Sequence, residues 1–191
     1  MIARSLIICL VLLTGLTSLS AQDDALVLYD NTRYMIGPRG LTEEVEITIQ
    51  INNKDGLGLA EVSIPYTSHD NISNIKARIE NESGLLLRSL KKKDIVDASS
   101  ISGISLYEDN RVKRFSLSNP TFPFILRYSY KRESKEYLQI CDWSPVIAYN
   151  ISVKEAKLVF EYPNDFDYKV SKIQVAEGTV VYKEGSNQAI W

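Results

Sequence analysis

The feature that most constrains this fold is an alternation of apolar and polar residues that recurs along nearly the whole chain. In EEVEITIQIN, Val45, Ile47, Ile49 and Ile51 share one phase, while glutamate, threonine and glutamine occupy the other. Because successive side chains of a strand point to opposite faces, this pattern predicts a strand with one buried and one solvated face. The same pattern recurs in five further runs, at residues 58–66, 74–80, 122–130, 155–163 and 171–178.

Turn-forming residues separate these runs. The segment Gly37-Pro38-Arg39-Gly40 is predicted to link the first two strands, because glycine and proline favour tight turns. No segment of helical length keeps an apolar stripe with a period of 3.6 residues, and one short helical turn is expected within residues 92–99. Many short strands with frequent turns indicate two packed antiparallel sheets or a partly open barrel. We therefore predict an all-β fold.

The first 21 residues have the layout of a secretory signal peptide. Arg4 precedes an apolar run from Leu6 to Leu13, and small residues follow up to Ala21. The run is too short to favour a membrane span, so we expect a periplasmic or secreted protein with no stable membrane insertion after cleavage. Residues 22–191 are predicted to form a single domain. Because the last residues are apolar and end on Trp191, we expect the chain to be a truncated copy or an N-terminal part of a longer protein.

Charge and cysteine content narrow the range of functions. The formal net charge of −2 favours neither nucleic acid nor an anionic membrane as a partner. Outside the signal peptide the single cysteine is Cys141, so no internal disulfide is available. One histidine and one cysteine do not make a usual zinc site, and we expect no cofactor or metal. Adjacent carboxylates such as Glu43 and Glu44 point to opposite faces of a strand, and we interpret them as solvated strand ends.

One alternative is a cysteine enzyme. Cys141 would be the nucleophile and His69 its base, with Asp142 or Asp70 orienting the histidine. The competing interpretation is a half-buried strand cysteine and a loop histidine. We favour the second interpretation, because Pro145 follows too soon for Cys141 to begin a long helix that would lower the pKa of its thiol.

A second alternative is a binding module. Tyrosine is enriched, with 11 in the chain, and tyrosine rings can stack on sugars or line a peptide groove. Tyr128 and Tyr130, however, share the phase of the apolar residues in their strand, which is typical of half-buried framework tyrosines. A stand-alone periplasmic module that binds glycan or peptide through exposed tyrosines therefore stays open as a hypothesis.

Five stretches, in order and with matching gaps, carry a resemblance to a known family. They are residues 60–66 (AEVSIPY), 75–79 (IKARI), 92–97 (KKDIVD), 105–113 (SLYEDNRVK) and 124–130 (FILRYSY). This series resembles domain-of-unknown-function family 3857, a bacterial module usually found ahead of a transglutaminase-like domain, and the resemblance runs from about residue 26 onward. It implies a β-sandwich similar to the N-terminal domain of M1-type aminopeptidases, in a secreted or periplasmic protein. It carries over no catalytic residue and so implies no enzymatic activity in this chain.

The charged stretch ISLYEDNRVKRFSL, residues 104–117, is predicted to be a β-hairpin. Leu106 and Val112 would hold it to the core, and residues 108–110 would form its turn. Phe115 is out of phase with Val112, which predicts a bulge near Lys113 or the residue after it.

The same hairpin is our candidate interface for a following domain. Its residues are Tyr107, Asp109, Arg111 and Lys113, and fully desolvated contacts between arginine and acidic residues would be its mark. From sequence we therefore expect an exported, non-catalytic accessory domain whose partner is a downstream transglutaminase-like domain or an envelope protein.

Overall fold

The structure is a computed structural model. It describes residues 23–100, 110–135, 137, 139–146, 148, 150–171, 183–185 and 187–191, with the side chains of 183–185 left aside. The predicted signal peptide, the predicted strand around Ile173 and the hairpin residues Leu106, Tyr107 and Asp109 lie outside the described residues. Within the described part, no helix has the length and apolar character that crossing a membrane requires.

Strands make up nearly all of the regular structure. They are β1 (Ala25–Gly37), β2 (Gly40–Ile51), β3 (Glu61–Tyr66), β4 (Asp70–Glu80), β5 (Leu86–Ser89), β6 (Val96–Ser99), β7 (Arg111–Ser116), β8 (Phe124–Ser134), β9 (Ile151–Val153), β10 (Ala156–Glu161), β11 (Lys183–Gly185) and β12 (Gln188–Ile190). Two short 3-10 helices, η1 (Asp55–Ala60) and η2 (Lys92–Asp94), precede β3 and β6. Residues 58–60 therefore belong to η1 rather than to the predicted strand, and the helical turn expected within 92–99 is confined to η2.

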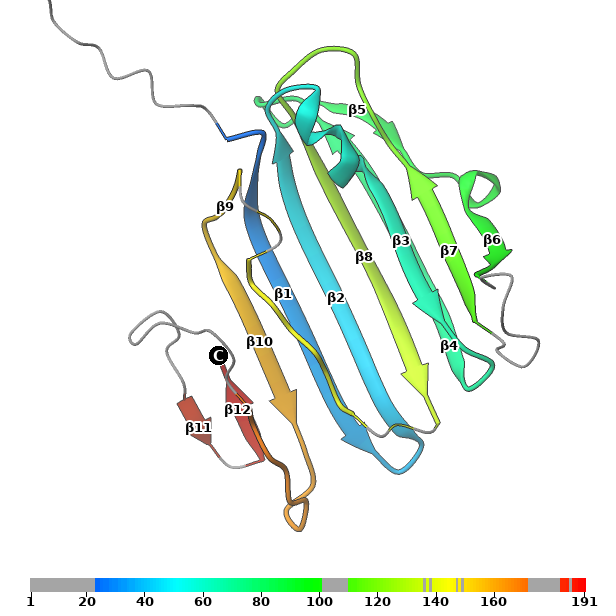
Figure 1. Cartoon of the computed structure of the whole chain (residues 1–191), viewed down its shortest axis with the longest axis vertical. Helices are drawn as coiled ribbons and strands as arrows, with labels where there is room; N and C mark the ends of the chain where they lie inside the picture. Colours follow the sequence, from blue (N-terminus) through cyan, green and yellow to red (C-terminus); the bar gives the residue numbers. More distant parts are fainter. Residues whose placement is uncertain are drawn as a thin grey trace, which may run out of the picture.

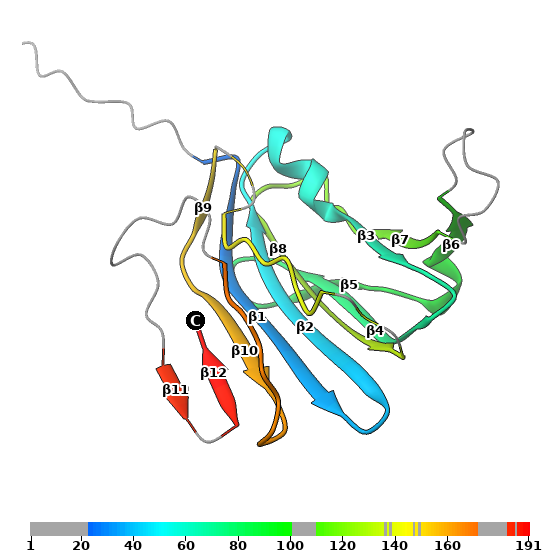
Figure 2. The same cartoon turned by 60° about the horizontal axis from the view of Figure 1, so that its bottom comes forward.

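The strands form two sheets that lie in separate layers (Figures 1 and 2). The large sheet has the order β11-β12-β10-β1-β2-β8-β4-β5, with β9 also paired to β1, and the small sheet has the order β3-β7-β6. Figure 2 shows the small sheet over the β8–β4 half of the large one. The prediction of an all-β sandwich is confirmed.

The predicted antiparallel pairing is wrong for β1, which has parallel neighbours on one side. β1 pairs in parallel with β10, where Asp30 lies opposite Ala156, and with β9. The reason is the path of the chain after β8. The described residues between 135 and 150, which we call the strap, run back along the sheet from the end of β8 to the start of β9 (Figure 1). The next strands therefore run in the same direction as β1.

The predicted turn between the first two strands is confirmed. β1 ends at Gly37 and β2 begins at Gly40, whose φ of 112° favours glycine. A Cβ atom on Gly40 would lie 2.2 Å from the main-chain oxygen of Ser134, so β8 approaches this turn too closely for any side chain.

The core lies between the layers, on what we call the inner face of the large sheet. Cross-strand register places side chains of neighbouring strands in rows on this face. Toward the start of β1 the rows are apolar: Ala25, Ile51 and Phe124 form one row, and Ile49, Leu126 and Ile79 form the next. The small sheet covers them with Val62, Ile64, Phe115 and Leu117.

The bulge predicted in β7 is absent. The register of β7 with β3 is continuous from Arg111 to Ser116, and Lys113 lies opposite Ile64. Val112 is buried, but it points to the side of the small sheet away from Ile64 and Phe115. The phase difference seen in the sequence therefore means that β7 has a buried residue on each face.

Candidate functional site

The inner face changes from apolar to polar toward the far end of β1. Tyr34, Glu43 and Arg132 lie opposite one another on β1, β2 and β8 and form a polar row. The hydroxyl of Tyr34 donates a hydrogen bond of 2.7 Å to Oε1 of Glu43. The Nε atom of Arg132 lies 3.2 Å from Oε2 of Glu43, without the geometry of a hydrogen bond. A nitrogen of the same guanidinium donates to the main-chain oxygen of Pro65 at 2.9 Å and so connects the two sheets.

This arrangement corrects our interpretation of Glu43 as a solvated strand end. Its side chain is 9 % exposed, against 46 % for its neighbour Glu44 on the other face. A signal for this was present in the sequence, since Glu43 shares the phase of Val45 and Ile47. A charged residue in the apolar phase of a strand is buried unless the sheet ends before it.

A cavity of about 460 Å³ opens beside this polar row. Its floor is the row itself together with Leu41, Ser134 and Asp70 from the next row. Asp70 accepts hydrogen bonds from the hydroxyl of Ser134 and from the main-chain N–H of Thr67. Burial raises the pKa of Asp70, but these hydrogen bonds outweigh that effect, and the net pKa is lowered. Asp70 therefore stays ionised in the cavity.

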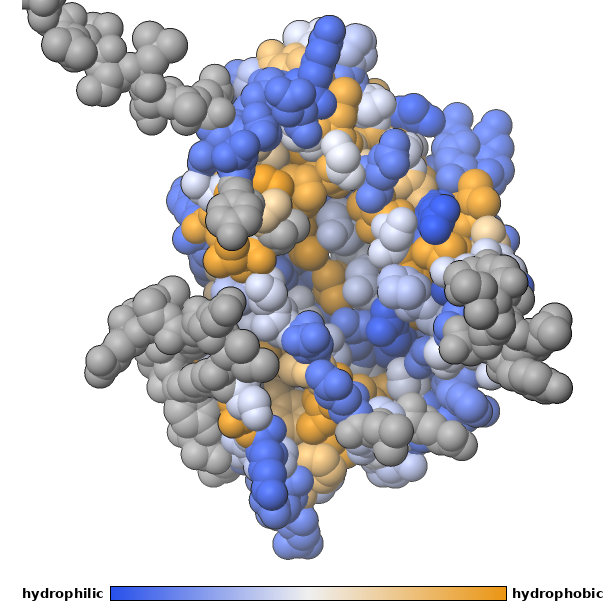
Figure 3. All heavy atoms as spheres, in the orientation of Figure 1, coloured by the Kyte–Doolittle hydropathy of each residue, from blue (hydrophilic) through white to orange (hydrophobic). Residues whose placement is uncertain are grey.

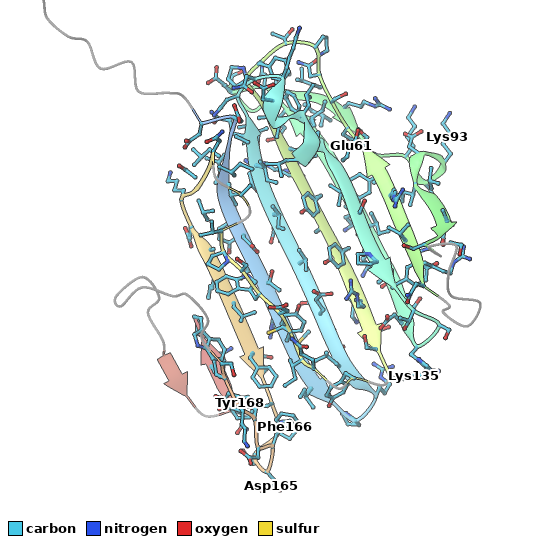
Figure 4. The ribbon with its side chains drawn as sticks, viewed as in Figure 1. Glu61, Lys93, Lys135, Asp165, Phe166 and Tyr168 are labelled. Carbon is cyan, nitrogen blue, oxygen red and sulfur yellow. The ribbon has the colours of Figure 1, made fainter. Side chains whose placement is uncertain are left out.

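The strap forms the opposite wall of the cavity, where Tyr137, Cys141 and Asp142 line it. Lys135, labelled in Figure 4 at the end of β8, begins the strap and donates its main-chain N–H to the main-chain oxygen of His69. Figure 2 shows the strap lying over β1 and β2, the half of the large sheet that the small sheet leaves open.

Farther along the strap, Trp143 directs its indole N–H toward Asp30 without forming a full hydrogen bond. Asp30 is buried on β1 and accepts a hydrogen bond of 3.0 Å from Thr32. Burial raises the pKa of Asp30, and this hydrogen bond only partly offsets the effect.

The cavity brings together the residues of the cysteine-enzyme alternative, since His69, Asp70, Cys141 and Asp142 all line it. The surroundings of the thiol favour its neutral form. Burial raises the pKa of Cys141, and the negative charges of Asp142 and Glu43 raise it further. Reactive cysteines, in contrast, usually have a pKa lowered by a nearby cation, a helix N-terminus or a metal. Among the described residues, no three histidine, cysteine or acidic side chains are grouped to hold a metal ion.

The second polar group is the Asp97 cluster, which consists of Tyr66, Asp97, Arg111 and Lys113 from β3, β6 and β7. Arg111 donates to Oδ1 of Asp97 at 2.8 Å, and Lys113 donates to Oδ2. The Tyr66 hydroxyl donates to the same carboxylate at 2.7 Å. These hydrogen bonds, that of Lys113 foremost, hold the pKa of Asp97 well below its ordinary value. The cluster shares a face of the small sheet with Ile64, so both sheets become polar toward the same end.

Two of the four predicted interface residues, Arg111 and Lys113, are thus brought together, and their acid partner lies across the sheet. We predicted that a docking surface would show fully desolvated contacts between arginine and acidic residues. The contacts of the Asp97 cluster stay partly exposed in this chain alone. Asp97 is 34 % exposed and Arg111 is 45 % exposed. Arg114, on the same strand, points to the other face and is exposed.

Tyr128 and Tyr130, which the sequence pattern predicts to be half-buried framework tyrosines, lie inside the sandwich. Tyr128 and Tyr130 are on the inner face opposite Ile47 and Val45, and burial raises the pKa of both. Tyr34 lies farther along this face, and its pKa is also raised, first by burial and then by Glu43. Figure 3 shows hydrophobic residues at the centre of this side of the molecule, with polar residues around them.

A third cluster is aromatic and closes the end of β10. Phe160 packs against Tyr162, Phe166 and Tyr168 with ring centroids 5.1–6.1 Å apart. Figure 4 places Phe166 and Tyr168 beside the end of that strand. The four aromatic rings carry no charge, and they pack together at the end of β10.

Comparison with solved structures supports the fold. A provisionally named protease from Parabacteroides distasonis ATCC 8503 has a TM-score of 0.65 and 12 % identity over 89 % of this chain. The chain spans only 35 % of that structure's length. Yeast LTA4 hydrolase with Bestatin (TM-score 0.37, 11 % identity, 91 % of this chain and 27 % of the other) is a more distant match. An M1 zinc metallopeptidase variant from Deinococcus radiodurans is also a distant match, with a TM-score of 0.36 and 12 % identity. The match covers 88 % of this chain and 38 % of the other.

No sequence of a characterised protein matches the chain. A family model does match, over residues 39–191, which is most of the sequence and includes all five stretches. The family is described as a "Domain of Unknown Function with solved-structure structure". The chain belongs to this family, DUF3857.

Proposed function

We propose that this chain is an exported, non-catalytic β-sandwich module that precedes a transglutaminase-like domain and docks against it. One observation supports the non-catalytic part: Cys141, the nucleophile of the cysteine-enzyme alternative, lies beside two carboxylates that raise its pKa. Replacing Cys141 by serine in the full-length protein should leave any hydrolase or acyl-transfer activity unchanged. A loss of activity in that variant would favour the cysteine-enzyme alternative instead.

The Asp97 cluster is the surface that we assign to docking. Two cations, Arg111 and Lys113, share the single carboxylate of Asp97, so the cluster keeps an excess of positive charge. Arg111 is nearly half exposed, and a planar guanidinium suits a second carboxylate. The partner surface should therefore present an aspartate or glutamate that covers and desolvates the cluster.

The experiment compares Arg111→Ala with Arg114→Ala. Both remove an arginine from β7, but only Arg111 lies in the Asp97 cluster. The affinity for the following domain, supplied as a separate protein, should fall about tenfold for Arg111→Ala and stay unchanged for Arg114→Ala. Equal affinities of the two variants would refute docking through this cluster.

The cavity supports a second candidate function, a stand-alone periplasmic module that binds glycan or peptide. Its walls include the aromatic rings of Tyr34 and Tyr137 and several polar groups, as small-ligand sites commonly do. A glycan array and a peptide array separate the two functions, because a pure docking module binds to neither.

A further inference from the structure

A run of three exposed leucines lies at one edge of the large sheet. Leu85, Leu86 and Leu87 are 63 %, 54 % and 40 % exposed; the last two belong to β5, and the first directly precedes it. Leu86 lies opposite Glu80, on the outer face, and the register shifts beside it, so that Leu87 falls between two register positions. Single exposed apolar residues are ordinary on a protein surface, but a contiguous group more often marks an interaction site.

The strand that carries these leucines also has a free edge. β5 is the last strand of the large sheet and, among the described strands, pairs with β4 alone. A terminal strand presents main-chain N–H and C=O groups that can pair with another strand. The terminal strands of the small sheet carry residues that oppose such pairing: β3 has Pro65 and the exposed Glu61, labelled in Figure 4, and β6 has Asp97. β5 instead has leucine at its first two positions.

Positive charge follows the leucines directly. Arg88 in β5 and Lys91, Lys92 and Lys93 after it are all exposed, and Figure 4 labels the last of them. Asp94, 3.9 Å from Arg88, offsets one of these four charges. The formal net charge of the whole chain is −2, so this basic end of β5 differs in sign from the rest. A partner that covers the leucines therefore meets positive charge beside them, and acidic groups on the partner would complement it.

The free edge distinguishes between two kinds of partner that share this chemistry, an anionic membrane surface and an acidic peptide. In hydrocarbon the main-chain groups of the free edge would have no hydrogen-bond partner, and open sheet edges do not occur there. A strand placed beside β5 pairs with those groups and also contacts the side chains along the edge. The structure therefore favours a peptide strand over a membrane.

We propose that β5 binds an extended peptide segment as an additional strand of the large sheet, with apolar residues beside Leu86 and Leu87 and acidic residues beside residues 91–93. Because β5 has only four residues, the main-chain pairing is short, and the leucines and lysines supply the remaining affinity. The inference does not depend on docking through the Asp97 cluster, because that cluster lies in the small sheet.

The test uses the purified chain and three peptides. The probe is acetyl-EDEVTVTV-amide, whose acidic first half would lie beside the lysines in antiparallel pairing with β5. Acetyl-KRKVTVTV-amide reverses the charge, and acetyl-EDEVPVPV-amide removes two main-chain N–H groups. Titration calorimetry at low salt should show at least about tenfold tighter binding of the probe than of either control peptide. Equal affinity for the probe and either control would overturn the proposal.

Variants and hydrogen exchange connect the binding to β5. Leu86→Asp should weaken binding of the probe about tenfold. The matched control is Val96→Asp, at a residue that is 59 % exposed on the terminal strand β6, and it should have no effect. Leu86→Asp also separates this site from the cavity, which no residue of β5 lines. The probe should slow hydrogen exchange of the main-chain amides of β5.

Three outcomes of these experiments would refute strand addition at β5. They are unchanged affinity in folded Leu86→Asp, unchanged hydrogen exchange in β5, and a particular result with phosphatidylglycerol vesicles. That result is vesicle binding that Leu86→Asp abolishes, in a chain that does not bind the probe, and it would identify a membrane as the partner instead.

Discussion

The ion pair between Glu43 and Arg132 offers the sharpest test of the inner face as described. In Arg132→Met the carboxylate of Glu43, 9 % exposed, loses the cation with which it forms an ion pair, and the main-chain oxygen of Pro65 loses a hydrogen-bond donor. Removing one partner of a fully buried pair costs about 3–5 kcal/mol. Because Arg132 is 25 % exposed, and water therefore reaches it, we expect a loss of about 2–3 kcal/mol in the free energy of unfolding.

Glu43→Gln combined with Arg132→Met should recover part of this loss, because no unpaired charge then remains buried. The coupling energy from the double-mutant cycle should be about 2 kcal/mol, measured by urea unfolding followed by circular dichroism. The matched control is the pair formed by Arg33 and Glu44 on the outer face, whose atoms are 4.0 Å apart and whose side chains are 41 % and 46 % exposed. Its coupling should not exceed about 1 kcal/mol. Equal coupling in the two cycles would refute the burial of the inner pair.

Two further predictions concern the core and the Asp97 cluster. Leu126→Ala should lower the free energy of unfolding by about 2–5 kcal/mol, because Leu126 is fully buried. Leu86 is exposed, so Leu86→Ala should change the free energy of unfolding by less than about 0.5 kcal/mol. Urea unfolding of both variants measures these changes. The folded-state pKa of Asp97 is depressed below its ordinary value of 3.8, so its stabilisation is present above that pH and is lost as the pH falls toward the folded pKa. Melting temperatures measured against pH should therefore show Asp97→Asn below the unmodified protein at pH 7, with the two curves converging in acid. Parallel curves would show that the ionisation of Asp97 does not stabilise the fold.

The strand pattern was readable from the sequence because burial of one face imposes a period of two. Val45, Ile49 and Ile51 face the core as their phase predicts. The turn before Gly40 was readable for a similar reason, since glycine and proline act within a few residues. Family membership followed from five ordered stretches, none of which is specific alone.

The parallel pairing of β1 with β10 depends on contacts between residues more than a hundred positions apart, which local periodicity does not encode. The cavity was missed for the same reason, because its walls come from β1, β2, β8 and the strap. Glu43 was misread because its phase was given less weight than its charge. The adjacent Glu44 is exposed, as charged residues usually are. Glu43 is buried because it lies in the polar row, where Tyr34 and Arg132 contact its carboxylate.

The central claim is that this chain is a non-catalytic module, although Cys141 and His69 line one cavity. The most direct test is the rate of Cys141 alkylation by iodoacetamide as a function of pH, with Cys9 replaced by serine so that one thiol remains. The account predicts slow alkylation at neutral pH and an apparent pKa above the ordinary value of 9.0 in the native protein, returning to that value in denaturant. Rapid alkylation at neutral pH, with an apparent pKa below 9.0 in the native protein, would contradict it.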